Sequence, residues 1–108
     1  VPLYRECQSL TVEWCRRLAK PNTSIYDLGC STGSLLLPLA ESISDVSGLR
    51  LIGVDNSKAM LNKAHKKLEN FSNSIELVFP KPMLDCNKVS VILIQNQFSI
   101  VGSKLLIE

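Results

Sequence analysis

The chain has 108 residues, of which 45% are hydrophobic and 20% are charged. This is the ordinary range for a globular protein, so we expect one domain over residues 1–108. The net charge of +2 is too small to indicate a nucleic-acid-binding surface. The longest uninterrupted apolar stretch, Val91 to Ile94, is far shorter than the roughly 20 residues that span a bilayer, so we expect no membrane segment.

The first element in chain order is an amphipathic helix from Tyr4 to Lys20. Its apolar residues recur at helical spacing, at Cys7, Leu10, Trp14 and Leu18. We expect this stripe to face the core, with Trp14 as its anchor. Pro21 ends the helix, because a residue that precedes proline is disfavoured in helical conformation. A short strand, Ile25 to Leu28, follows.

Two further helices alternate with strands. The leucines behind Gly33 predict a buried helix that starts near Ser34, with a slight kink at Pro38. Leu49 to Val54 is a second strand. Asn56 or Ser57 can cap the next helix. Its predicted core residues are Ala59, Met60, Ala64 and Leu68.

Two more apolar runs, Ile75 to Phe79 and Val89 to Ile94, predict further strands. Strands that alternate with helices are joined by right-handed crossovers and form a mainly parallel sheet. We therefore predict an α/β fold of the three-layer, Rossmann-like kind with about four to five strands.

The four cysteines, Cys7, Cys15, Cys30 and Cys86, are widely separated. Because they form no C-x-x-C pair and His65 is the single histidine, we expect no metal site. His65 also lies among lysines, which is typical of a solvated helix face. The sequence does not open on the basic and apolar segments of a secretory signal, so we expect free thiols and a cytoplasmic protein.

The loop after the first strand is the first candidate site. It reads Asp27-Leu28-Gly29-Cys30-Ser31-Thr32-Gly33, and its glycines allow the backbone to approach a ligand closely. Ligands of such sheets bind outside the carboxyl ends of the strands. The G-x-x-x-G spacing disfavours a dinucleotide, whose fingerprint is G-x-G-x-x-G. Tight strand-to-helix packing is the alternative role of both glycines, and small-residue packing explains Cys30 better than a nucleophilic role.

Asp55 is the second candidate. It follows the second strand, about 20 residues beyond the loop, where a carboxylate can accept hydrogen bonds from both ribose hydroxyls of a nucleoside. Its alternative role is a cap on the following helix. The loop and Asp55 together favour a nucleoside site over an arbitrary α/β loop.

These residues resemble those of class I S-adenosylmethionine-dependent methyltransferases. The resemblance rests on the loop, on Gly53-Val54-Asp55-Asn56-Ser57 and on Ala59-Met60. Ser31, together with Val1-Pro2-x-Tyr4 ahead of the first helix, makes the pattern most similar to the carboxy-S-adenosylmethionine synthases, which act in tRNA wobble-uridine modification. The similarity is dense up to about Leu68 and thins thereafter.

The resemblance implies a cytoplasmic transferase that binds S-adenosyl-L-methionine or carboxy-S-adenosyl-L-methionine, with prephenate as a candidate second substrate. By this resemblance Asp55 holds the ribose with Asn56 beside it, Gly29 lies against the amino-acid end of the ligand, and Tyr4 lines the pocket. The other cofactor-binding residues that we expect are Asp27, Cys30, Ser31, Gly33, Ser57 and Gln95. No catalytic base can be named. The alternative is a catalytically inactive nucleoside-binding or partner-docking module; a nicotinamide-dependent oxidoreductase is disfavoured by the glycine spacing.

The sequence departs from the family after the third predicted strand. Phe79-Pro80-Lys81-Pro82 stands where the family has an acidic pair that contacts adenine, so this contact is missing or is supplied by Asp85. After the fourth strand, where the family has an asparagine, the chain has Gln95 and Asn96.

The tail allows two interpretations, because residues 95–103 are too few for a parallel crossover. In one, Phe98 to Val101 and Lys104 to Ile107 form a hairpin joined by Gly102-Ser103. In the other, the chain is a fragment or a shortened version of a longer domain, and this is the interpretation that we favour. We then expect a homo-oligomer that covers the open edge of the fourth strand.

Overall fold

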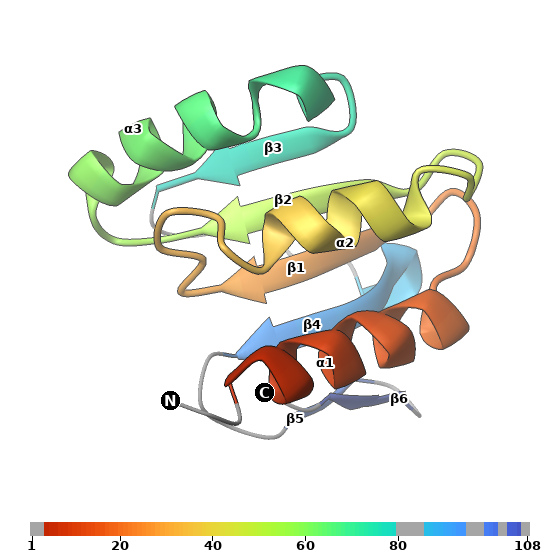
Figure 1. Cartoon of the computed structure of the whole chain (residues 1–108). Coiled ribbons are helices and arrows are strands. Elements are labelled where there is room, and N and C mark those ends of the chain that lie inside the picture. Colours follow the sequence, from red (N-terminus) through yellow and green to blue (C-terminus); the bar gives the residue numbers. More distant parts are fainter. Residues whose placement is uncertain (1–3, 80–85, 95–98, 102–103, 107–108) are drawn as a thin grey trace.

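A computed structural model describes residues 4–79, 86–94, 99–101 and 104–106 (Figure 1). Its elements are α1 (Tyr4–Leu18), β1 (Ser24–Leu28), α2 (Leu36–Ile43), β2 (Arg50–Val54), α3 (Lys58–Lys67), η1 (Glu69–Phe71), β3 (Ile75–Val78), η2 (Cys86–Lys88), β4 (Val89–Ile94), β5 (Ser99–Val101) and β6 (Lys104–Leu106). The order confirms the predicted alternation of strands and helices. None of the helices in these ranges has the length and apolar character to cross a membrane.

Four strands form one parallel sheet in the order β3-β2-β1-β4. The order reverses at β1, which pairs with β2 on one side and with β4 on the other. All four arrowheads in Figure 1 therefore point to the same edge. The parallel α/β prediction is confirmed.

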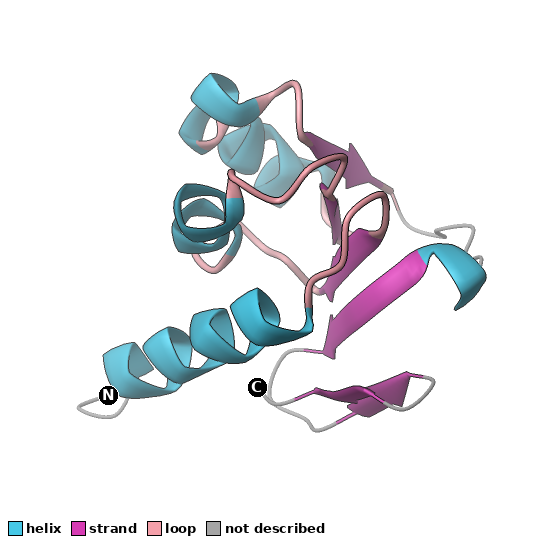
Figure 2. Ribbon diagram, turned by 90° about the vertical axis from the view of Figure 1, so that its right-hand side faces the viewer, coloured by secondary structure: helices cyan, strands magenta, loops and turns pink. Residues whose placement is uncertain are grey.

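The helices α1, α2 and α3 all lie on one face of this sheet (Figures 1 and 2). The crossovers through α2 and α3 advance in the same direction across the sheet, and right-handed crossovers of that kind place both helices on one face. The predicted three-layer arrangement is thus seen only as two layers in the described ranges. The return from β3 to β4 runs through residues 80–85, which lie outside them.

The helix α1 packs through a different face from the predicted one. Thr11 and Cys15 are buried, whereas Cys7 is exposed and Leu10 keeps 52% of its surface exposed. Trp14 is half-buried, so it is not the core anchor that we expected. The polar Thr11 can face the core because its hydroxyl donates to the carbonyl of Cys7, 2.8 Å away within the same helix.

The helix α2 begins at Leu36, later than predicted, and this removes the reason for a kink at Pro38. Pro38 lies in the first turn, where a backbone N–H has no intrahelical partner in any case. The carbonyl of Ser34, four residues earlier, accepts instead from Nε2 of Gln8 on α1 at 2.9 Å. The side chain of α1 thus replaces a bond that proline cannot make.

The helix α3 begins at the predicted cap, because the hydroxyl of Ser57 accepts from the N–H of Met60 at 3.3 Å. Its core residues are Leu61, Ala64 and, at its end, Leu68. Ala59 is exposed, so the predicted stripe was wrong at that position. The spacing of three and four residues holds, but it starts from Leu61.

The strands β5 and β6 form an antiparallel hairpin in which Ser99 pairs with Leu106. The described residues thus form the hairpin predicted for the tail, and this pairing is also compatible with the favoured interpretation of a shortened domain. The hairpin lies beside β4 (Figures 1 and 2) but forms a separate two-stranded sheet. In the described ranges, β4 is therefore an edge strand of the main sheet.

Candidate functional site

The candidate residues gather at the carboxyl edge of the parallel sheet. The glycine loop follows β1, and Asp55 follows the neighbouring strand β2. The strand order reverses beside β1, and this is the position at which open α/β sheets bind their ligands. The helix α1 also begins at this edge, with Tyr4 as its first residue (Figure 1).

The loop is shaped by its backbone. Gly29, Ser31 and Gly33 have positive φ angles of 80°, 53° and 83°. Positions 29 and 33 suit glycine, which has no Cβ to clash in the left-handed region of φ. Ser31 adopts the same left-handed conformation as an L-residue and is therefore strained. The N–H groups of Gly29 and Cys30 both donate to the carbonyl of Val54, at 2.7 and 2.9 Å. The loop is thereby folded back over the end of β2.

Asp55 links this loop to the start of α3. Its Oδ2 accepts from the backbone N–H of Ser31, and its Oδ1 accepts from the N–H of Ser57, both at 2.8 Å. The second bond is an Asx-turn. The alternative role predicted for Asp55, a cap on the following helix, is wrong, because Ser57 is the cap of α3. Each carboxylate oxygen has a further lone pair, so both can still accept a ligand hydroxyl. The half-buried carboxylate therefore shapes the site and remains available to a ribose.

Cys30 lies beneath the loop and is buried. Burial raises the pKa of its thiol to about 12, and the nearby negative charges of Asp27 and Asp55 act in the same direction. The thiol is thus protonated at neutral pH and is a poor nucleophile. This supports the packing role predicted for Cys30.

Two glycines are needed for space. A Cβ at position 33 would lie 2.9 Å from Cδ1 of Leu68, closer than real Cβ contacts come. A Cβ at position 53 would lie 2.6 Å from Cδ1 of Leu36 and 2.9 Å from Sγ of Cys30. The packing role therefore accounts for Gly33. The sequence analysis assigned no role to Gly53, although a glycine inside a strand indicates a close approach.

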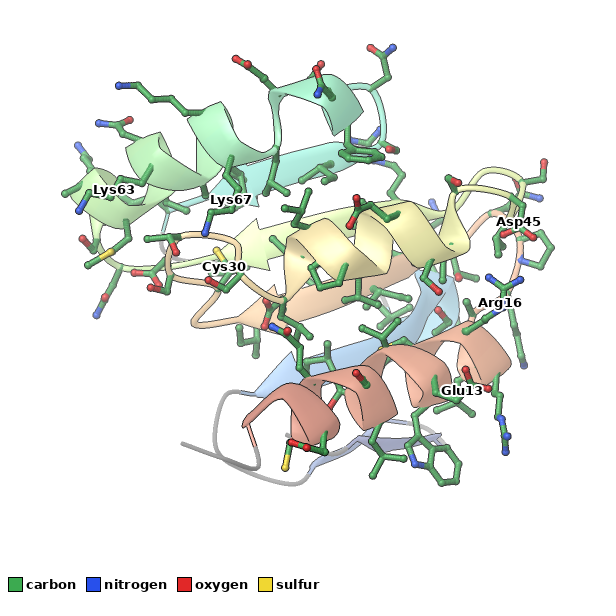
Figure 3. All side chains as sticks on the ribbon, in the orientation of Figure 1. Glu13, Arg16, Cys30, Asp45, Lys63 and Lys67 are labelled. Carbon is green, nitrogen blue, oxygen red and sulfur yellow. The ribbon has the colours of Figure 1, made fainter. Side chains whose placement is uncertain are left out.

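Lys67 is a further residue that the sequence analysis missed. Its Nζ donates to the hydroxyls of Thr32 and Ser34, at 3.3 and 3.4 Å. Figure 3 shows Lys67 reaching from α3 toward the segment that carries Cys30. Lys67 is exposed, as expected of a helix lysine, and the sequence gives no signal of these two contacts.

The structure thus brings Gly29, Cys30, Ser31, Asp55 and Ser57 together at one edge. Two further loop residues that we expected to bind cofactor are buried: Asp27 lies in β1 and Gly33 packs against Leu68. Asn56 is exposed beside Asp55. The side chains of Tyr4, Gln95 and Asp85 lie outside the described part, so their roles stay predictions. Within that part, no three histidine, cysteine or acidic residues are grouped as a metal site would require.

Comparison with known proteins shows that the chain is similar to methyltransferases in sequence. Residues 25–104 match a family described as a methyltransferase domain. The chain is 45% identical over 80 residues to the carboxy-S-adenosyl-L-methionine synthase of Methylococcus capsulatus, covering 72% of this chain and 33% of that one. The synthase of Sulfurimonas denitrificans is 40% identical over 77 residues, with coverages of 71% and 32%.

Solved structures agree with the fold. The S-adenosylmethionine-dependent methyltransferase from Thiobacillus denitrificans, in complex with S-adenosyl-L-homocysteine, has a TM-score of 0.66 at 19% identity and covers 90% of this chain and 38% of that chain. A methyltransferase from Geobacter sulfurreducens, also with S-adenosyl-L-homocysteine, has a TM-score of 0.64. The chain spans about a third of the length of the curated relatives that it matches.

Proposed function

Because the chain belongs to the methyltransferase domain family, we propose that it binds S-adenosyl-L-methionine, or carboxy-S-adenosyl-L-methionine, between the loop after β1 and Asp55. The observation that carries the proposal is the Asp55 carboxylate. It is fixed by the N–H groups of Ser31 and Ser57 at the end of β2, with lone pairs left for two ribose hydroxyls.

The residues at this edge fit such a ligand. Gly29 adopts a positive φ and has no Cβ, so the backbone of the loop can come close to the amino-acid end of the ligand. The buried, protonated Cys30 places no charge against the sulfonium. The bound cofactor would supply a carbon group activated by its sulfonium. The part of this chain would be to hold the ribose and to fix the orientation, which can supply much of the rate.

Similarity to the carboxy-S-adenosyl-L-methionine synthases supports a transferase that modifies the methyl group of S-adenosyl-L-methionine. We propose prephenate as the second substrate and a place in tRNA wobble-uridine modification in the cytoplasm. The net charge of +2 offers no support for direct tRNA binding. The chain would therefore contribute to that modification through its small-molecule product.

A second candidate is a nucleoside-binding module without turnover. It is favoured by the described site itself, in which the loop backbone and the Asp55 carboxylate are groups suited to binding a nucleoside. Turnover separates the two candidates: the chain is incubated with S-adenosyl-L-methionine and prephenate, and carboxy-S-adenosyl-L-methionine is measured by mass spectrometry. Product formation supports the transferase, whereas binding of S-adenosyl-L-homocysteine without product supports the module. Binding of NAD in place of either cofactor would contradict both.

We also propose that the chain forms a homo-oligomer through β4. In the described ranges this strand has one hydrogen-bonded neighbour in the sheet, β1, and its core residues Val91 and Leu93 are almost fully buried. An edge strand of this kind can pair with a second copy, which would compete with the β5–β6 hairpin that lies beside β4. Light scattering at micromolar concentration is expected to give at least a dimer; a cooperatively melting monomer would contradict it.

A further inference from the structure

The outer side of α1 carries two apolar side chains that do not belong to the core. The helix packs on the sheet through the side that holds the buried residues Thr11 and Cys15. Leu10 and Trp14 are four positions apart, so they are neighbours on another side of the helix. Leu10 keeps 52% of its surface exposed, and Trp14 is half-buried. Neighbouring apolar side chains at a protein surface often mark an interaction site.

A shallow hollow lies beside Leu10. It is lined by four residues of α1, which are Glu6, Ser9, Leu10 and Glu13. These residues have the spacing i, i+3, i+4 and i+7, and four residues with this spacing form the hole into which a side chain of a facing helix packs. Figures 1 and 2 show α1 at one end of the helix layer, beside β4. The hollow thus has the form of a helix-packing site.

The charge along this side of α1 reverses from the beginning of the helix to its end. Glu6 lies in the first turn and Arg17 in the last. Glu13 pairs with Arg17 at 3.3 Å, whereas Glu6 has no ion-pair partner in the part of the chain that the structure describes. An antiparallel second copy of α1 would bring its own Arg17 to Glu6. The symmetry of such a pair would form this contact twice.

The same alignment brings an aromatic ring to the hollow. Trp14 lies three residues before Arg17, so Trp14 of the second copy lies opposite the residue three positions after Glu6 of the first copy. That residue is Ser9, in the middle of the hollow. One alignment of the two helices therefore places a charge beside Glu6 and fills the hollow with an indole ring.

We propose that α1 is a dimerisation surface for a second copy of this chain. The two helices pack antiparallel about a two-fold axis, and the indole of Trp14 of each copy fills the hollow of the other. The ring packs on Leu10, and its N–H can donate to a carboxylate at the rim of the hollow. One pair of helices buries less than the roughly 1,200 Å² of a standard interface, so we expect dissociation in the micromolar range. This surface is separate from the edge of β4.

Trp14 is the single tryptophan of the chain, so its fluorescence reports on this surface. Dilution of the 108-residue chain from roughly 100 to 1 micromolar should shift the emission maximum to longer wavelength, because the indole leaves the hollow for water. Sedimentation velocity over the same concentrations measures the dissociation constant. Trp14→Ala is expected to raise this constant more than about 30-fold, since an aromatic anchor is lost from both copies.

A charge exchange tests the alignment without disturbing the core, because Glu6 and Arg17 are both exposed. Glu6→Arg and Arg17→Glu are each expected to raise the dissociation constant about ten-fold, because each places two pairs of like charges across the interface. Glu6→Arg combined with Arg17→Glu restores opposite charges in both pairs, so its constant should return to within about three-fold of the wild type. Glu69→Arg is the matched control. It makes the same change of charge at an exposed residue of η1, at the far end of the sheet (Figure 1), and should dimerise as the wild type does.

The outcomes separate this surface from the proposed pairing through β4. A wild-type chain that stays monomeric at roughly 100 micromolar would overturn both proposals. If the chain associates and neither Glu6→Arg nor Trp14→Ala weakens the association, the α1 surface alone is overturned. A double charge exchange that fails to restore what the single variants lose, or an emission maximum that stays constant while the mass changes, would also overturn it. Loss of association in the single variants and its return in the double variant supports the α1 surface.

Discussion

Two segments form the proposed binding edge, and they keep their shapes by different means. The loop of residues 29–34 is shaped by the backbone, through three positive φ angles and two N–H groups that share the carbonyl of Val54. The turn after β2 is shaped by one charged side chain, Asp55, which binds an N–H with each oxygen. The loop keeps its shape because the glycines at positions 29 and 33 have no Cβ to clash at a positive φ. The turn after β2 keeps its shape because the charged carboxylate of Asp55 accepts two backbone hydrogen bonds.

The two segments meet at one hydrogen bond, between the N–H of Ser31 and Oδ2 of Asp55. Ser31 is the loop residue held in a left-handed conformation without being glycine. The carboxylate thus stabilises the most strained position of the loop, where the cost is of order 1–2 kcal/mol. Substitutions in the loop should therefore weaken binding through steric clash. Substitutions at Asp55 should weaken it both by removing the ribose contact and by changing the conformation of the loop.

Gly29→Val should have the largest effect on binding. A Cβ at a φ of 80° strains the loop and crowds the ligand side of the edge, so binding of S-adenosyl-L-homocysteine should be abolished while the circular dichroism stays near native. Gly48→Val is a harsher control, because Gly48 has a positive φ of 68° in the loop that precedes β2 and a Cβ there would also clash with Oδ1 of Asn22; this variant should lose stability and still bind when folded. Binding that persists in Gly29→Val would reduce Gly29 to a packing residue.

Asp55→Ala should weaken binding by about 1.5 to 3 kcal/mol, the usual loss of a charge-assisted hydrogen-bonding group. The exposed Asp45, which pairs with Arg16 at 3.6 Å, provides the matched control Asp45→Ala. Calorimetry measures both. Unchanged affinity in a folded Asp55→Ala variant would remove this residue from the site.

Ser31→Gly should change stability in the opposite direction from an ordinary serine-to-glycine substitution. Relief of the left-handed strain should leave the free energy of unfolding unchanged or raise it by up to about 1 kcal/mol. Ser42→Gly in α2 should instead lower it by roughly 0.5 kcal/mol, the difference between the helix propensities of serine and glycine. Urea unfolding of both variants checks this, and equal losses would mean that Ser31 is not strained.

The pH dependence of stability tests the burial of two thiols, Cys15 in α1 and Cys30 in the glycine loop. Burial raises the pKa of the Cys15 and Cys30 thiols from 9.0 to about 12, with the charge of Asp27 as a further cause. Above pH 9 the unfolded chain loses these protons and the folded chain keeps them, so stability should fall as the pH rises from about 9 toward 12. Between pH 8 and 10, urea unfolding should show a smaller fall for Cys15→Ala than for the wild type. The exposed thiol variant Cys7→Ala should behave as the wild type, and equal falls in all three would contradict the assignment.

Much of this arrangement follows from local sequence. The apolar runs predict the four parallel strands, and the position of each loop after its strand brings the glycine loop and Asp55 to one edge. The face of α1 was not predictable, because Thr11 hides its hydroxyl by bonding within its own helix. The spacing of hydrophobic residues cannot reveal a buried polar residue whose hydroxyl is hydrogen-bonded within its own helix.

The contacts that fix the loop from outside were also beyond the sequence. Gln8 reaches Ser34 across 26 positions, and Lys67 reaches Thr32 across 35. Each is a polar residue on a helix, where solvent exposure is the ordinary outcome. Their partners are set by how α1 and α3 pack on the sheet, which no local pattern encodes.

The most direct test of the shared site is an ¹⁵N NMR titration with S-adenosyl-L-homocysteine, followed at the amides of Ser31 and Ser57. Both amides donate to Asp55, so a ribose that binds this carboxylate should shift both signals in parallel with the calorimetric isotherm. The account predicts these shifts in the wild type and their loss in Asp55→Ala. Saturable binding that leaves both amides unmoved would show that the ligand binds elsewhere and would contradict the account.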